Sequence, residues 1–134
     1  MNGNYVAILI GAIVPMVLGF IWYGPLFGDR WMKIVGITKK DMEAKKSEMP
    51  KSYTTMFIAA LVMAYVLSRF VMYGGATTAV SGALIGFWAW LGFIATVKLT
   101  DVLFNGKPMN LYYIDISYRL VSLLIMGAIL GMLR

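Results

Sequence analysis

Four long apolar runs divide the chain, and most of the polar residues lie between them. The runs cover residues 4–23, 53–73, 76–97 and 111–133, and each is 20 to 23 residues long. An α-helix rises about 1.5 Å per residue, so each run reaches about 30 Å, the thickness of a bilayer core. The pattern predicts an all-α integral membrane protein, a four-helix bundle forming a single membrane domain over residues 1–134.

The connection over residues 26–52 has its own pattern. Its first part carries apolar side chains at helical spacing (Phe27, Trp31, Ile34 and Val35), which predicts a short amphipathic helix lying at the membrane surface. Thr38 and Asp41 form a variant of the capping box that opens a further short helix. Pro50 is expected to end that helix and Ser52 to cap the second span.

Special residues also mark the first run. Pro15 predicts a kink near its middle, eased by the neighbouring glycines. Trp22 and Tyr23 close the run, and both residue types favour the headgroup region, so they are interpreted as interfacial anchors. No basic residue precedes this run and no small-residue cleavage site follows it, so we expect a retained span and not a signal peptide.

Composition agrees with a membrane class. The chain is 60% hydrophobic and 13% charged, whereas soluble domains carry roughly 25% charged residues. It contains neither Cys nor His, so thiol and imidazole chemistry is excluded, and no metal site or cofactor is expected. No nucleophile is tied to a base in a known catalytic pattern, so an enzyme is not expected.

The cations are distributed unevenly. The chain has a net charge of +6, and seven Lys or Arg residues lie between Asp29 and Ser52, whereas the turn at Gly74 and Gly75 has none. Cytoplasmic loops are enriched in Lys and Arg. Residues 26–52 and 98–110 are therefore expected in the cytoplasm, with both termini outside the inner (cytoplasmic) membrane. The basic connection also suits contact with anionic lipid, and topology and lipid explain it without nucleic acid.

Small residues recur at helical spacing in the last two runs. Gly82 and Gly86 form a G-x-x-x-G pattern in the third run, and Gly127 and Gly131 form another in the fourth. Such patterns let two helix backbones approach closely. They predict close helix packing. So small a bundle has little surface with which to enclose a solute, which favours a homo-oligomer, most simply a dimer.

Charged residues inside the fourth run are the main candidate site. Asp115 and Arg119 lie one helical turn apart, roughly 6 and 12 Å deep from Leu111, and charges at membrane depth are costly. The remaining candidates are Tyr118 and Ser122 on or beside the same face, and Lys98 and Asp101 just past the third run. The group is interpreted either as an ion-pair network that locks two helices together, or as a site for an ion, proton or charged solute.

Two stretches resemble a known family. One is Trp22-Tyr23-Gly24-Pro25-Leu26-Phe27-Gly28, and the other runs from Tyr118 through Met126-Gly127-Ala128-Ile129-Leu130. Together they are similar to the domain-of-unknown-function 1761 family of small four-span membrane proteins. The resemblance implies the same four-helix plan and brings no assigned activity. Two functions stay open: an oligomeric transporter or channel for an ion or small solute, or a non-transporting membrane scaffold that binds lipid or a partner.

Overall fold

Residues 5–36, 38–44, 49–106 and 108–133 are described by the computed structural model. The regular structure within these ranges is entirely helical. Four stretches are long and apolar enough to cross a membrane: Tyr5–Leu26, Pro50–Tyr73, Ala79–Asn105 and Met109–Met132. The prediction of an all-α membrane protein with four spans is therefore confirmed, and we refer to these stretches as the first to fourth spans.

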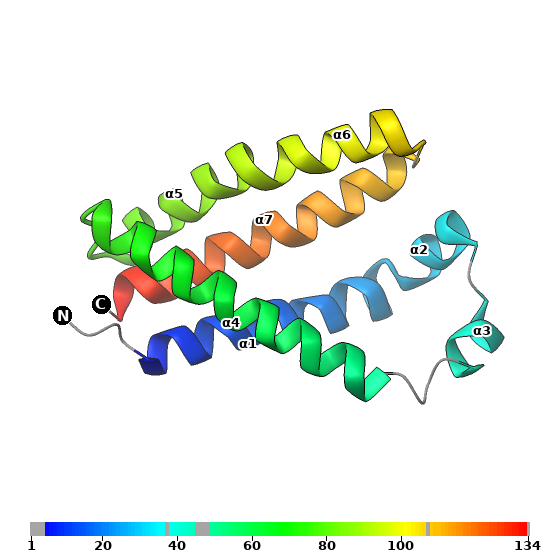
Figure 1. Cartoon of the computed structure of the whole chain (residues 1–134), viewed down its shortest axis with the longest axis horizontal. Helices are drawn as coiled ribbons and strands as arrows, with labels where there is room; N and C mark the ends of the chain where they lie inside the picture. Colours follow the sequence, from blue (N-terminus) through cyan, green and yellow to red (C-terminus); the bar gives the residue numbers. More distant parts are fainter. Residues whose placement is uncertain (1–4, 37, 45–48, 107, 134) are drawn as a thin grey trace.

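The spans form a bundle whose helices diverge toward one end (Figure 1). The first span is α1 (Tyr5–Ile21) with the π-helical segment η1 (Trp22–Leu26), the second is α4 (Met49–Tyr73), and the fourth is α7 (Met109–Met132). The third consists of α5 (Ala79–Ala89), the π-helical segment η3 (Trp90–Ala95) and α6 (Thr96–Asn105). Both termini lie at one end, and α2 (Gly28–Val35) and α3 (Lys39–Ala44) lie at the other.

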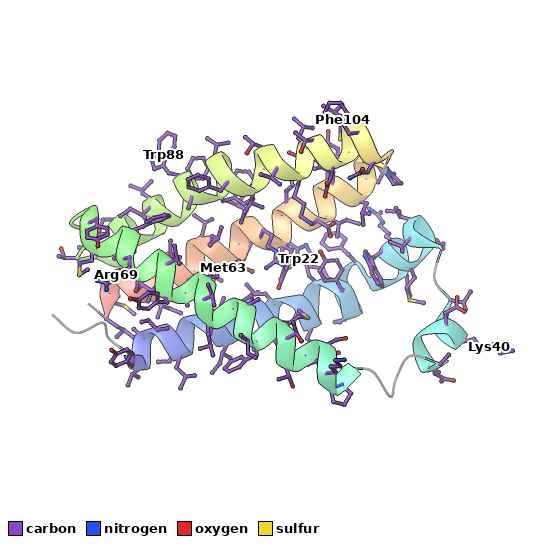
Figure 2. The ribbon with its side chains drawn as sticks, in the orientation of Figure 1. Trp22, Lys40, Met63, Arg69, Trp88 and Phe104 are labelled. Carbon is purple, nitrogen blue, oxygen red and sulfur yellow. The ribbon has the colours of Figure 1, made fainter. Side chains whose placement is uncertain are left out.

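The fourth span is the central helix of the bundle. It contacts α1, α4 and α5, and its contact with α5 is the most extensive in the molecule. Within its most apolar window 44% of residues are buried, against 11% in the third span. Figure 2 shows the difference, with Trp88 and Phe104 pointing away from the bundle on the third span. The fourth span is therefore the one helix that packs closely against all three others, while α1 and α4 also pack extensively against each other.

Glycines make the contact between α5 and α7 possible. A Cβ atom on Gly82 would overlap the carbonyl oxygen of Gly127, and one on Gly86 would overlap the carbonyl oxygen of Leu123. A Cβ atom on Gly131 would likewise overlap the carbonyl oxygen of Thr78. Backbone therefore lies directly against backbone, as small-residue patterns allow in membranes. The four glycines are used within one chain and do not supply an interface between copies.

The first span breaks at Gly24. Pro15 lies inside α1, whereas the non-helical backbone angles fall at Gly24 (φ −107°, ψ −107°), and the amide of Phe27 donates to the carbonyl oxygen of Trp22 at 2.8 Å. The chain then enters α2, which ends at Gly36 in the left-handed conformation (φ 80°). Helix α2 has the predicted amphipathic pattern, and its placement in the membrane surface stays a prediction.

Two boundaries differ from the sequence predictions. The capping box at Thr38 and Asp41 is confirmed, because each backbone amide donates to the other side chain, at 3.0 and 3.2 Å. Pro50, however, lies in the first turn of α4 and does not end the preceding helix, and Ser52 lies inside α4 instead of capping it. The first turn tolerates proline because its amide has no intrahelical partner there. Asn4, residues 45–48 and Lys107 lie outside the described residues.

The third span is longer than its apolar run. Helix α6 continues to Asn105 and ends at Gly106, whose φ of 68° is left-handed. Lys98 and Asp101 therefore lie on a helix and not in the predicted connection over residues 98–110. The apolar run ends at Val97 because polar residues follow it. The helix itself continues until Gly106, where the backbone adopts the left-handed conformation that ends it.

Candidate functional site

Polar side chains gather where the first half of α7 meets the first and third spans, at the end opposite the chain termini. The hydroxyl of Tyr23, in η1, donates a hydrogen bond to Oδ1 of Asp115. Asp115 is half-buried. A carboxylate at this depth requires a donor, because an unpaired charge in a low-dielectric environment is costly. Tyr23 provides that donor from η1, across the contact between the first and fourth spans.

The position of Tyr23 follows from the break in the first span. Its ring packs edge-on against Trp31 of α2, with 5.7 Å between ring centroids, and against Tyr118 of α7, at 5.4 Å. A Cβ atom on Gly28 would lie 2.7 Å from the carbonyl oxygen of Tyr23. Only a residue without a side chain fits there, so Gly28 lets the first turn of α2 fold back against Tyr23.

Two further hydrogen bonds join the first and fourth spans. Nε1 of Trp22 donates to Oγ of Ser117 at 3.3 Å, and the hydroxyl of Tyr118 donates to the carbonyl oxygen of Pro15 at 2.6 Å. Gly19 makes room for the second bond, since a Cβ atom there would lie 3.2 Å from the Tyr118 hydroxyl. With Tyr23 these bonds form a polar seam through which α1 and η1 are attached to α7.

The third span is attached to α7 in the same region. Nε1 of Trp90, in η3, donates to the carbonyl oxygen of Ile116 at 2.9 Å. The hydroxyl of Tyr112 donates in the other direction, to the carbonyl oxygen of Ala95 at 2.9 Å. Both π-helical segments of the described chain therefore lie beside the polar half of α7.

Asp115 and Arg119 do not form the ion pair that their spacing suggests. Asp115 accepts from Tyr23, and the guanidinium of Arg119 lies over the ring of Tyr118, 4.9 Å from its centroid. Each charged group is thus held by an aromatic neighbour. The expectation from sequence considered contacts along one helix, whereas the aromatic residues of η1 and α7 supply the partners.

Three of the predicted residues share one cleft. Lys98 and Asp101 of α6 and Asp115 of α7 line a space of about 10 Å³, enough for about one water molecule. Nδ2 of Asn105 donates to Oδ1 of Asp101 at 3.0 Å. Lys98 and Asp101 therefore do meet Asp115, whereas Arg119 does not line this cleft.

Tyr118 and Ser122 lie apart from that cleft. Tyr118 is buried against α1, and Ser122 is fully buried in the middle of the bundle, where its hydroxyl has no hydrogen-bond partner among the described residues. The neighbouring core is apolar, with Met126 fully buried one turn further along. The six predicted residues therefore divide into a small charged cleft, an aromatic contact and a buried core position.

Sequence reasoning missed the residues that tie this region together. The placement of Trp22 and Tyr23 at the headgroups stays a prediction, but both are also half-buried and bond to α7, and Figure 2 shows Trp22 between the first and fourth spans. Aromatic residues at the end of a span suit an interface and a seam equally well. A π-helical segment also leaves no mark in the hydropathy pattern. In the described part of the chain, no three acidic residues gather as a metal site would require.

The fold and this seam define a class: a small helical membrane protein with four spans whose polar residues concentrate at one end. The family model of DUF1761, described as a protein of unknown function, matches residues 6–131, and the chain belongs to this family. The predicted resemblance is thereby confirmed. A UPF0591 membrane protein of Schizosaccharomyces pombe is 24% identical over 108 residues, covering 76% of this chain and 72% of its own. No solved structure matches the chain.

Proposed function

We propose that this chain is a subunit of a small transporter or channel for an ion or small solute, and not an enzyme. In this proposal Asp115 binds or releases the transported ion or proton. One observation carries the proposal: Asp115 lies within a span, takes its hydrogen bond from the broken end of another helix, and shares a water-sized cleft with Lys98 and Asp101. Ionisable residues inside spans commonly mark ion or proton pathways.

The irregular helices beside Asp115 support the same proposal. Tyr23 belongs to η1 and Tyr112 bonds to the last residue of η3. π-Helical segments occur frequently at functional sites, and transporters commonly build their sites from discontinuous helices. A break at Gly24 allows the two parts of the first span to change their angle while α1 stays packed.

A route across the membrane would have to run between copies of the chain. The part of the bundle nearer the termini is closed by the glycine contact of α5 with α7 and by apolar side chains such as Leu67, Val71 and Leu130. The proposal therefore includes a homo-oligomer, with a dimer as the simplest form. It also includes the orientation predicted from the cations, with both termini outside and Asp115 toward the cytoplasm.

Replacing Asp115 by Asn is expected to abolish flux and to leave the fold intact. The amide oxygen of the substituted side chain still accepts from Tyr23, but the group can no longer ionise. Proton flux into proteoliposomes, followed with trapped pyranine under a potassium diffusion potential, and sodium tracer uptake measure the effect. The variant should fall to the rate of protein-free vesicles.

Asp29→Asn is the matched control, because Asp29 is exposed on α2 and lies outside the seam. It should keep the wild-type rate. Wild-type flux in the Asp115 variant would contradict the assigned role. A wild-type protein that moves neither protons nor sodium above the protein-free rate would favour a second candidate.

That second candidate is a non-transporting scaffold that binds lipid or a partner, and the closed apolar part of the bundle favours it. Its test must avoid Gly82 and Gly127, because substitutions there disturb contacts within the chain. Exposed residues of the third span, such as Trp88, are the appropriate positions for substitutions that test lipid or partner binding, since 64% of that side chain is exposed.

A further inference from the structure

A groove between α2 and α7 lies beside the polar seam and plays no part in the proposed transport. Its volume is about 580 Å³, within the usual range of about 300–1,000 Å³ for small-molecule sites. The residues that matter are Arg30, Lys33 and Ile34 of α2, and Asn110, Tyr113 and Ile114 of α7. We call this hollow the α2–α7 groove.

The rim of the groove is polar and cationic. Arg30, Lys33, Asn110 and Tyr113 are all exposed. Arg binds phosphate through two parallel N–H groups, Lys contributes a point charge, and amide and phenol groups donate further hydrogen bonds. No Asp or Glu is among the described residues of the lining, and Asp29 lines a neighbouring hollow that shares Lys33 with the groove. The lining therefore carries a charge of +2 and suits an anion.

The floor of the groove is mostly apolar, with Ser117 as its polar member. Ile114 is 8% exposed and Ile34 is half-buried. A free anion gains nothing from such a floor, whereas an acyl chain does, because each buried methylene contributes favourably. An exposed cationic rim above a buried apolar floor is complementary to a molecule with an anionic head and an apolar tail.

The position of the groove indicates which kind of amphiphile would bind in it. Helix α2 follows within two residues of the first span, and Asn110 is the second residue of the fourth. The groove thus lies where two spans meet the membrane surface, at the level of phospholipid headgroups. The first turn of α7 adds unpaired backbone N–H groups, which favour negative charge.

We propose that the α2–α7 groove is a binding site for one anionic phospholipid. Arg30 and Lys33 bind its phosphate, Asn110 and Tyr113 donate to the headgroup oxygens, and the start of one acyl chain lies on Ile34 and Ile114. Of the seven cations in the connection over residues 26–52, this site uses two, so it differs from a general attraction of basic residues to the membrane. It stands on residues other than Asp115 and is independent of the transport proposal.

Lipid affinity of the purified full chain tests the site. In neutral detergent, native mass spectrometry should show phosphatidylglycerol binding about 25-fold more tightly than phosphatidylcholine with the same acyl chains, since each Lys or Arg near anionic lipid contributes about a factor of five. The double variant Arg30→Gln with Lys33→Gln should lose this preference. Equal affinity of the two lipids for the wild-type chain would overturn the proposal.

Two matched controls separate the groove from charge alone. Lys40→Gln with Lys51→Gln removes the same charge from exposed positions that do not line the groove, and should keep the preference. Asn110→Trp fills the groove without changing charge and should abolish it, whereas Met109→Trp, one residue outside the lining, should not. An Asn110→Trp variant with wild-type preference would overturn the site.

A third measurement separates a phospholipid from a free anion. Inorganic phosphate, added in the same experiment at the concentration of the lipid, should leave phosphatidylglycerol bound, because it cannot use the apolar floor. Full displacement by inorganic phosphate would reject the lipid assignment.

Discussion

Tyr23 connects three helices through one residue. Its hydroxyl donates to Asp115 of α7, its ring packs against Trp31 of α2, and its carbonyl oxygen excludes a side chain at Gly28. These contacts give a physical reason for the Trp-Tyr-x-Pro-Leu-x-Gly segment, residues 22–28, that carries the family resemblance. The segment bends the first span at Gly24 and attaches the bend to the fourth span.

Replacing Tyr23 by Phe is expected to destabilise the bundle by about 1–3 kcal/mol, because Asp115 loses its donor while the ring packing remains. Unfolding in detergent, followed by loss of helical circular dichroism, measures the change. Tyr53→Phe is the control, since 50% of that side chain is exposed and its substitution removes no hydrogen bond to Asp115. Equal stability of the two variants would show that the Tyr23 hydroxyl contributes nothing to the seam.

At the scale of whole helices, the spans follow from hydropathy and the details of their ends do not. The four apolar runs predict four helices because the bilayer leaves no other structure for them. The run ending at Val97 cannot predict that α6 continues to Asn105, since polar residues are compatible with a helix that leaves the membrane. Lys98 and Asp101 consequently line a cleft with Asp115 from a helix and not from a connection.

The partners of the charged residues could not be predicted for a related reason. Asp115 and Arg119 are spaced as an ion pair on one helix, and nothing in that spacing reports Tyr23, which is 92 residues distant in sequence. The glycine patterns do predict close packing of two helices, because the missing side chains of the glycines are what allows two backbones to approach. They could not say whether the approaching backbone belongs to the same chain.

Gly127→Ala is expected to destabilise the contact of α5 with α7 by about 1–3 kcal/mol, because the added methyl overlaps the carbonyl oxygen of Gly82. Gly92→Ala is the matched control, since a Cβ atom there meets nothing within 4 Å. The midpoint of unfolding in increasing denaturing detergent compares the two. A Gly127 variant as stable as the Gly92 variant would contradict the packing described.

At the scale of the molecule, both termini lie at one end and the basic connection lies at the other (Figure 1). Figure 2 places Arg69 near the first end and Lys40 at the second. This arrangement fits the alternation of cations between connections. The positive-inside rule then predicts which end faces the cytoplasm.

Single cysteines measure that orientation cleanly, because the chain contains none. Lys40→Cys is expected to react with a membrane-impermeant maleimide only after cells are opened, and Thr77→Cys, between α4 and α5, to react in intact cells. Both positions are exposed. The reverse pattern would place the termini in the cytoplasm and overturn the orientation derived from the positive-inside rule.

The central position of α7 has a consequence for biosynthesis. The third span packs mainly on α7, and α1 and α4 each contact it as well, although this helix leaves the ribosome after all three. Until Met109–Met132 has entered the bilayer, the carbonyl of Pro15, the indole of Trp22 and the bare backbone at Gly82 lack their partners. Insertion of the last helix thus supplies the hydrogen-bond and packing partners that the first and third spans lack until then.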